Sequence, residues 1–182
     1  MPWYRVAGKI QQPLTEQDFQ EGMTNGTFKQ DRHRAYCILL YYSAVRKMEG
    51  LRATREQFTV TQTSLIFQVG KRLKHGIETP ALVLPRKADY VEELVKAVEE
   101  TKPGQRVFPY SHGTGYNIVR RAFKYPHLFR LSRITNFFLE GWTIAQVHSW
   151  TGLTLKALDY YIGLVDVAKM GESLARKDRA KV

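Results

Sequence analysis

Apolar residues recur at helical spacing over most of the chain. The longest such segment runs from Gln30 to Leu51 and repeats apolar side chains every three or four positions, at Ala35, Ile38, Leu39, Tyr42 and Val45. We expect this segment to be the main buried helix. Gly50 marks its stop, and Arg46 lies near its end.

Further helices are predicted at about 15–24, 87–101, 113–123, 127–140, 143–150 and 153–164. The first begins at an N-cap signal, Thr15 followed by Asp18 in the first turn. Turn residues separate the others, including Lys102-Pro-Gly104, Tyr125-Pro126 and Gly141.

The strand signal is confined to the middle of the chain. Residues 57–70 and 77–84 are rich in β-branched and aromatic side chains, which predicts a β-hairpin with a basic loop between them. A short extended piece is expected at Val107–Pro109. The pattern therefore predicts an α+β fold, mainly helical, with one small antiparallel sheet.

Length and charge narrow the class of protein. With 182 residues, 43% of them hydrophobic, the chain can build one full-sized core, so we expect a single domain over 1–182, with its core at about 15–165. The 28 Lys and Arg against 17 Asp and Glu give a formal charge of +11. This excess favours a polyanionic partner such as nucleic acid, the alternative being solvated surface lysines.

The single cysteine, Cys37, excludes an intrachain disulfide and a cysteine-based zinc site, and it indicates a reducing, intracellular setting. No apolar run is long enough for a membrane helix, and the N-terminus lacks the apolar core of a signal peptide. We expect a cytoplasmic, DNA-associated protein that does not contact a membrane.

Three motifs resemble those of tyrosine recombinases, the phage integrase family. Ser43–Leu51 is similar to the family's Thr-Gly-Leu-Arg-x-x-Glu-x-x-x-Leu signature, with Arg46 and Glu49 in place. His127-Leu-Phe-Arg130 is similar to its His-x-Leu-Arg-His box, and the segment that ends at Tyr161 resembles its closing Leu-Gly-His…Tyr segment. Each motif is weak alone, whereas their order and spacing together are specific.

The chain departs from the family pattern at two positions. Leu131 stands where the box has its second histidine, and Gly152 stands where a later His or Trp is expected. Trp150, with His148 close by, is the candidate for that sixth group.

The resemblance implies a role for each group. Arg46 and Arg130 would fork onto the oxygens of a phosphodiester under attack. His127 would take the proton of a tyrosine whose pKa is ordinarily near 10. A hairpin lysine would protonate the leaving 5′-oxygen; Lys71 and Lys74 both fit, and Lys74 is slightly favoured. Neither metal nor ATP is required, and no cofactor is expected.

Two of these residues have plainer alternatives. Arg46 would serve equally as a cation that offsets the macrodipole at a helix C-terminus, and His127 as a helix cap. Neighbouring side chains on a helix point about 100° apart, so only one of Tyr160 and Tyr161 can face the phosphate. Tyr161 is the predicted nucleophile and Tyr160 the alternative.

A basic surface for DNA phosphates is predicted from side chains on several segments: Arg52, Arg55, Lys71, Arg72, Lys74, Arg120, Arg121 and Lys124. The alternative is a dispersed, solvated set. The resemblance further implies double-stranded DNA as substrate and a homo-oligomer, a tetramer, on paired sites. Residues 165–182 resemble a tail that family members dock onto a neighbouring protomer. The family also adds an N-terminal DNA-clamping domain, without which we expect weak site affinity.

The sequence thus predicts a site-specific recombinase or integrase of a mobile genetic element, virus or plasmid, acting through a 3′-phosphotyrosine intermediate. Two alternatives stay open. One is a type IB topoisomerase or hairpin resolvase that uses the same residues, and the other is a catalytically inactive DNA-binding relative.

Overall fold

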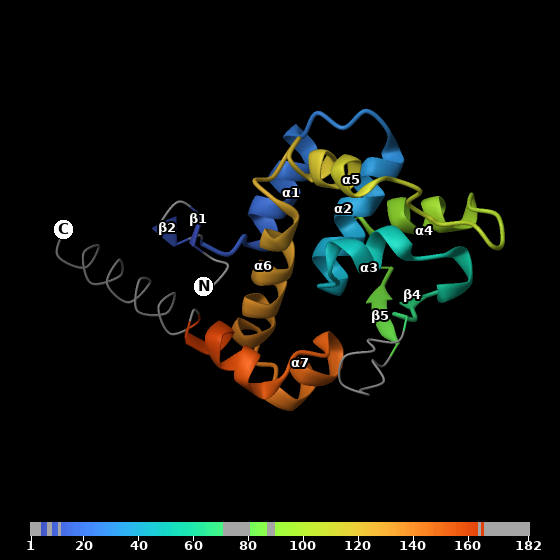
Figure 1. Cartoon of the computed structure of the whole chain (residues 1–182). Helices are drawn as coiled ribbons and strands as arrows, with labels where there is room; N and C mark the ends of the chain where they lie inside the picture. The colour runs from blue at the N-terminus through green and yellow to red at the C-terminus, as the bar shows by residue number, and fades with distance from the viewer. Residues whose placement is uncertain are drawn as a thin grey trace.

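The computed structural model describes residues 5–6, 9–10, 12–70, 81–86, 90–163 and 165. In chain order the elements are β1 (Arg5–Val6), β2 (Lys9–Ile10), α1 (Glu16–Asn25), α2 (Asp31–Ser43), α3 (Lys47–Arg52), a 3₁₀ turn (Arg55–Gln57), β3 (Phe58–Val60), β4 (Ser64–Phe67), β5 (Leu82–Pro85), α4 (Val91–Glu99), α5 (His112–Val119), α6 (Pro126–Leu139) and α7 (Ile144–Thr151). A further segment, the final helix, covers 155–163. The mainly helical α+β class is confirmed (Figure 1).

Helix α1 begins at the predicted capping signal. The hydroxyl of Thr15 accepts a hydrogen bond from the Asp18 backbone N–H at 3.1 Å, and the Asp18 carboxylate accepts one from the Thr15 N–H at 2.8 Å. This reciprocal pair satisfies two donors that a helix start otherwise leaves open. One turn further, Phe19 is fully buried and stacks on Tyr41 of α2 with ring centroids 3.9 Å apart.

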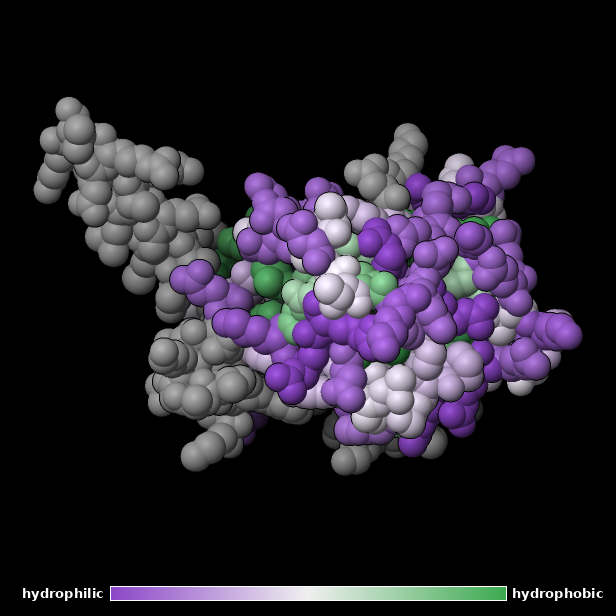
Figure 2. Space-filling model, turned by 90° about the horizontal axis from the view of Figure 1, so that it is seen from above, coloured by the Kyte–Doolittle hydropathy of each residue, from purple (hydrophilic) through white to green (hydrophobic). Residues whose placement is uncertain are grey.

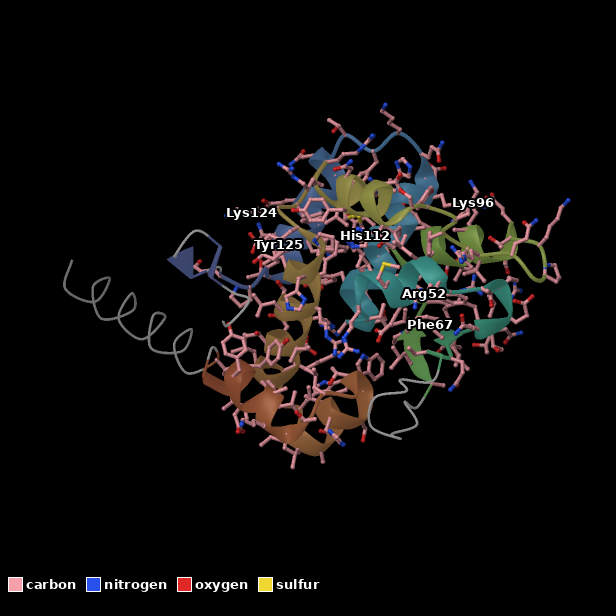
Figure 3. All side chains as sticks on the ribbon, in the orientation of Figure 1. Arg52, Phe67, Lys96, His112, Lys124 and Tyr125 are labelled. Atoms are coloured by element: carbon pink, nitrogen blue, oxygen red, sulfur yellow. The ribbon has the colours of Figure 1, made fainter. Side chains whose placement is uncertain are left out.

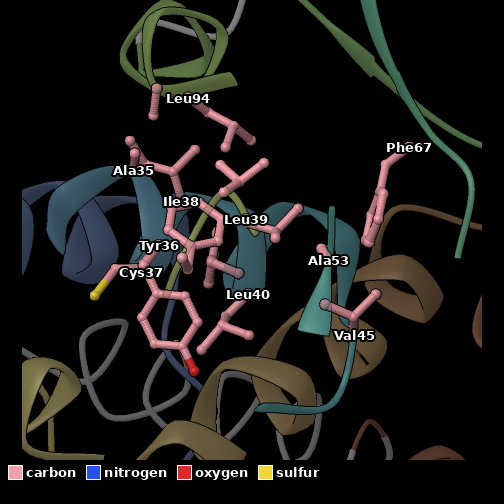
Figure 4. Close-up of a cluster of buried hydrophobic side chains, with 14 of the residues drawn as sticks. Ala35, Tyr36, Cys37, Ile38, Leu39, Leu40, Val45, Ala53, Phe67 and Leu94 are labelled. Atoms are coloured by element: carbon pink, nitrogen blue, oxygen red, sulfur yellow. The ribbon is translucent and has the colours of Figure 1, made fainter. Parts of the chain in front are cut away.

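Helix α2 is the centre of the core, as its apolar pattern predicted. Every residue from Ala35 to Tyr41 is buried, so the helix is covered on all sides. It packs against α4, α6 and β5. Figure 4 shows its side chains reaching toward Leu94 of α4 and lying near Phe67 of β4.

The predicted long helix over 30–51 is wrong at its C-terminal part. Helix α2 ends at Ser43, because Ala44 adopts a left-handed conformation with φ of 54°. A residue in this region closes a helix and is usually glycine. Arg46 therefore precedes α3 instead of ending a helix, so it cannot serve as the C-terminal cation considered above.

Two contacts from later in the chain hold the bend at Ala44. The buried Arg130 guanidinium donates to the Ala44 carbonyl, and the Trp150 indole N–H donates to the Ser43 carbonyl at 3.2 Å. Both acceptors lie at the end of α2, where carbonyls lack helical partners. Tertiary hydrogen bonds thus stabilise a turn that local sequence does not favour.

The hairpin prediction is corrected to a three-stranded antiparallel sheet in the order β3-β4-β5. The run at 57–70 turns within itself and supplies two of the strands, pairing Phe58 with Phe67. At the turn, the Thr61 hydroxyl accepts from the Ser64 N–H at 3.0 Å, so a side chain supplies the turn without Gly or Pro. The basic loop falls largely in 71–80, outside the described residues.

The remaining helices lie close to their predicted ranges. Helix α4 buries Val91, Leu94, Val95 and Val98, the face expected for it. Proline at the first position starts α6, and Gly141, with φ of 88°, follows its end. The extended piece expected at Val107–Pro109 forms no strand, although the adjacent Arg106 makes an isolated bridge to Thr54. An additional two-stranded ladder, β1 with β2, was not predicted.

The buried side chains form two clusters. The larger joins α1–α5 and the sheet, and the smaller joins α6, α7 and the final helix through residues such as Leu131, Phe137 and Leu158. Leu14 and Trp150 pack against both clusters. Figure 2 shows a largely hydrophilic face with a small hydrophobic area near its middle. Within the described ranges, no helix has the length and apolarity needed to cross a bilayer.

Candidate active site

The two clusters meet around a cavity of about 740 Å³. Its lining comes from separated parts of the chain: Val45, Arg46, Lys47, Met48, Tyr116, Tyr125, Pro126, His127, Arg130, Leu131, Leu153, Ala157, Tyr160 and Tyr161. Figure 3 shows nitrogen-bearing side chains converging in the space bounded by α3, α6 and α7. The cavity therefore brings together Arg46, His127, Arg130 and both candidate tyrosines.

Arg46 lies at the start of α3, oriented by Glu49. The Arg46 backbone N–H donates to the Glu49 carboxylate at 2.7 Å, and its guanidinium Nη1 donates to the other oxygen at 3.1 Å. The arginine side chain is 54% exposed while the glutamate is 18% exposed. Glu49 thus holds one edge of the Arg46 guanidinium, while the rest of the side chain remains accessible to a ligand.

Arg130 lies in the middle of α6 and is only 2% exposed. Its Nη1 donates to the Ala44 carbonyl and its Nη2 to the Thr151 carbonyl at 3.0 Å. These two acceptors are neutral, so they fix the guanidinium in place without cancelling its charge. A buried, positively charged fork of this kind suits an anion that enters the cavity.

His127 occupies the first turn of α6, beside both arginines. Burial is the main reason that its pKa falls to about 4, and the positive charges of Arg130 and Arg46 lower it further. The imidazole is therefore neutral near pH 7 and can accept a proton. An anion between the arginines would raise this pKa, because it offsets their charges.

The final helix brings Tyr160 and Tyr161 to the cavity, with their rings edge to face at 5.3 Å. Tyr161 is 6% exposed and its hydroxyl makes a hydrogen bond with Arg130. Burial raises the pKa of Tyr161, while the charges of Arg130 and Arg46 act in the opposite direction. Both tyrosines line the cavity, and the expectation that only one of them faces the phosphate stays a prediction.

Trp150 is placed away from the cavity lining. Its indole packs against Phe137 and Trp142 and donates to the Ser43 carbonyl. The nearby His148 pairs its Nδ1 with the Leu153 carbonyl at 2.5 Å. The sixth group assigned to Trp150 therefore stays a prediction, and its observed contact is with the backbone ahead of Arg46.

The other predicted residues do not line the cavity, as far as the structure describes them. Lys71, Arg72 and Lys74 lie outside the described residues. Arg52, Arg120 and Lys124 are exposed, whereas Arg55 and Arg121 are partly buried and donate to the carbonyls of Phe58 and Thr27. Figure 3 places Arg52 on α3 and Lys124 near the start of α6.

Sequence reasoning missed other lining residues, notably Lys47, Tyr116 and Tyr125. Tyr125 directly precedes the Pro126-His127 pair, and its buried hydroxyl has no hydrogen-bond partner in the part of the chain that the structure describes. Lys47 directly follows Arg46, and adjacency to a motif was the available signal for both. Tyr116 carries no such signal. No group of three or more His, Cys, Asp or Glu side chains suited to a metal occurs among the described residues.

The chain resembles solved structures of recombinases and integrases. The chain matches XerH site-specific recombinase bound to difH substrate, in the pre-cleavage complex, with a TM-score of 0.60 and 16% identity, covering 85% of this chain and 51% of that one. It matches XerA recombinase with a TM-score of 0.63 and 12% identity, covering 86% and 60%. A lambda integrase tetramer bound to a Holliday junction matches with a TM-score of 0.53 and 14% identity, covering 85% and 50%.

The chain thus spans about half the length of the XerH chain. No family model and no curated protein matches the sequence. The structural likeness extends over 85% of this chain. The chain has the fold of a tyrosine recombinase catalytic domain.

Proposed function

We propose that the chain is the catalytic part of a site-specific DNA recombinase that cleaves and rejoins strands through a 3′-phosphotyrosine. The observation that carries this proposal is the convergence of Arg46, His127, Arg130 and Tyr161 on one cavity from distant parts of the sequence. Those four side chains are the types that phosphoryl transfer to tyrosine needs. The fold supplies the same arrangement of elements as recombinases of known structure.

The two arginines bind the phosphodiester. Arg46 approaches the phosphate from the open side of the cavity and Arg130 from the buried side. Each guanidinium can then donate two hydrogen bonds to the non-bridging oxygens. Negative charge grows on these oxygens as the pentavalent transition state forms, which is where fixed donors accelerate a reaction most. Arg130, held by two carbonyls, is already oriented before DNA arrives.

Tyr161 is the nucleophile in this proposal. Its phenol oxygen forms a bond to phosphorus while the bond from phosphorus to the 5′-oxygen breaks. Neutral His127 takes the phenol proton, and the phosphate raises the proton affinity of the imidazole as it binds. Lys74, or Lys71, gives a proton to the departing 5′-oxygen; both lie outside the described residues.

The phosphotyrosine keeps the energy of the broken phosphodiester. A 5′-hydroxyl of another strand can therefore attack it and reverse the chemistry, with no nucleotide cofactor consumed. We propose double-stranded DNA as substrate and a tetramer on paired sites as the working assembly. Solved relatives in DNA complexes, one of them a tetramer on a Holliday junction, support this part.

Covalent trapping tests the reaction. Nicked suicide duplexes are incubated with the protein, and the mixture is denatured in detergent and examined for a protein–DNA adduct. Wild type and Tyr160→Phe should form the adduct, and Tyr161→Phe should not. The tyrosine pair provides a matched control, because both rings line the same cavity. An adduct lost only in Tyr160→Phe would transfer the role to Tyr160, and salt-sensitive binding with no adduct in any protein would favour a DNA-binding function.

A further inference from the structure

A group of positive and aromatic side chains adjoins the cavity and has no part in the proposed cleavage. Lys47 of α3 and His112 of α5 meet with their Nζ and Nε2 atoms 2.6 Å apart. A charged ammonium can only donate a hydrogen bond, so in this contact Nε2 of His112 is the acceptor. His112, labelled in Figure 3, therefore positions Lys47 at the boundary between α3 and α5.

Tyr116 brings a second cation to the same place. The Lys47 ammonium lies 5.5 Å from the Tyr116 ring centroid, and the Arg120 guanidinium carbon lies 6.0 Å from it. A ring face stabilises a cation, so this tyrosine holds two like charges near each other. Lys47 and Tyr116 also line the cavity, which makes the group continuous with the active site.

The described part of the chain places no acidic partner on the cations of this group. Arg34, Arg46, Arg86 and Arg133 all form ion pairs with carboxylates. Among the residues that the structure describes, no ion pair joins Lys47, His112 or Arg120 to an acidic side chain. Burial lowers the pKa of Lys47, which means that the surroundings provide less stabilisation of its charge than water would.

The surface here also allows a close approach. Apart from its chain neighbours and the backbone of its own helix, no described atom lies within 4 Å of the position that a Cβ of Gly113 would occupy, next to His112 in the first turn of α5. Two cations without an acidic partner among the described residues, beside open space at Gly113, can accept a phosphate from outside the protein.

We propose that Lys47, positioned by His112 and Tyr116 and joined by Arg120, forms a second phosphate subsite that binds a backbone phosphodiester flanking the one in the cavity. This inference rests on the proposed function for the identity of the anion as DNA. The subsite holds the duplex in register, so that the phosphate between Arg46 and Arg130 is the one presented to Tyr161.

Binding of a short duplex measures the subsite without any chemistry. Lys47→Gln should weaken binding roughly fivefold at low salt and reduce the slope of log affinity against log salt by about one, the loss expected for a single phosphate contact. Lys47→Arg should restore most of the slope. Lys96→Gln is the matched control, since Lys96 lies on α4 with Asp31 at 3.8 Å (Figure 3), and its slope should equal that of wild type.

Neutral methylphosphonate links placed singly around the cleavage position identify the contacted phosphate. At one flanking position the link should slow adduct formation by wild type and Lys96→Gln but have no further effect on Lys47→Gln. Full sensitivity of Lys47→Gln at every position, or an unchanged salt slope, would overturn the subsite. If no protein forms an adduct with any duplex, the proposed function fails, and the salt slopes alone decide on the subsite.

Discussion

At the scale of single residues, the two arginines differ in what they contribute to the folded protein. Arg46 is largely exposed and joined to Glu49, whereas Arg130 is buried and joined to two backbone carbonyls. Removing a buried donor leaves its acceptors unsatisfied, which costs about 1–3 kcal/mol for each group. Exposed ion pairs contribute far less.

This difference predicts two separable phenotypes. Arg130→Lys should lower the free energy of unfolding by roughly 2–4 kcal/mol, because one ammonium cannot reach both carbonyls in fork geometry. Arg46→Lys should change it by less than about 0.5 kcal/mol. Both variants should form adduct at least about 100-fold more slowly. Urea denaturation and adduct kinetics measure the two effects, and equal losses of stability would contradict this assignment.

The low pKa of His127 predicts the pH dependence of cleavage. A base must be unprotonated, so a pKa lowered to about 4 moves the acid limb of the rate to lower pH than an ordinary histidine would. With DNA below saturation, the rate reports the free protein. It should stay independent of His127 ionisation from about pH 5.5 to about pH 7.5 and fall toward about pH 4.

His127→Gln supplies the comparison. This variant should be roughly 100-fold slower and should lack the acid limb. Adduct rates are measured across the pH range, with urea denaturation at each pH to confirm that the proteins stay folded. A wild-type limb centred near 6.5, the ordinary pKa of histidine, would show that the imidazole is not held as described.

At the scale of elements, periodicity and capping were enough to predict most helices. The Thr15–Asp18 box and the apolar face of α4 act within a few residues, so the sequence displays them directly. The end of α2 was not predictable in this way, because alanine has no local preference for the conformation of Ala44. That bend depends on Arg130 and Trp150, which lie far along the chain.

The residues of the candidate site also fall into those that a local sequence pattern predicts and those that it does not. Motif spacing identified Arg46, His127, Arg130 and Tyr161, since each belongs to a recognisable local pattern. The contact between Lys47 and His112 joins residues that are 65 positions apart, so no local sequence pattern predicts it. The division of 57–70 into two strands was missed because a threonine hydroxyl, without Gly or Pro, makes the turn.

The packing of α5 against α3 yields a prediction at this scale. A Cβ on Gly115 would lie 3.0 Å from both methyl groups of Leu51 and 3.2 Å from the Tyr36 hydroxyl, whereas one on Gly113 would meet nothing. Gly115→Ala should therefore destabilise the protein by roughly 1–3 kcal/mol through overpacking. Gly113→Ala should be neutral or stabilising by up to about 1 kcal/mol, as alanine suits a helix. Thermal and urea unfolding of the pair test this, and equal effects would show that α5 is not in close contact with α3.

At the scale of the whole molecule, the net charge of +11 leads us to expect that binding of the proposed DNA partner stabilises the folded chain. A duplex present at 100 times its dissociation constant should add about 2.7 kcal/mol to stability. For a chain of this size, that raises Tm by roughly 5–10 °C. In salt of about 0.5 M the gain should vanish, because releasing the same counterions into more concentrated salt yields less free energy. Differential scanning fluorimetry at low and high salt measures both values, and equal shifts would show that the charge does not drive binding.

The order of the site along the chain has a consequence for protein synthesis. Arg46, His127 and Arg130 leave the ribosome before Tyr161, whose helix is anchored by the buried Leu158 on the cluster of α6 and α7. On the proposed chemistry, a chain that stops before Tyr161 lacks the nucleophile and cannot form the covalent intermediate. A chain that stops before Leu158 lacks this residue as well, so the cluster of α6 and α7 loses a buried partner.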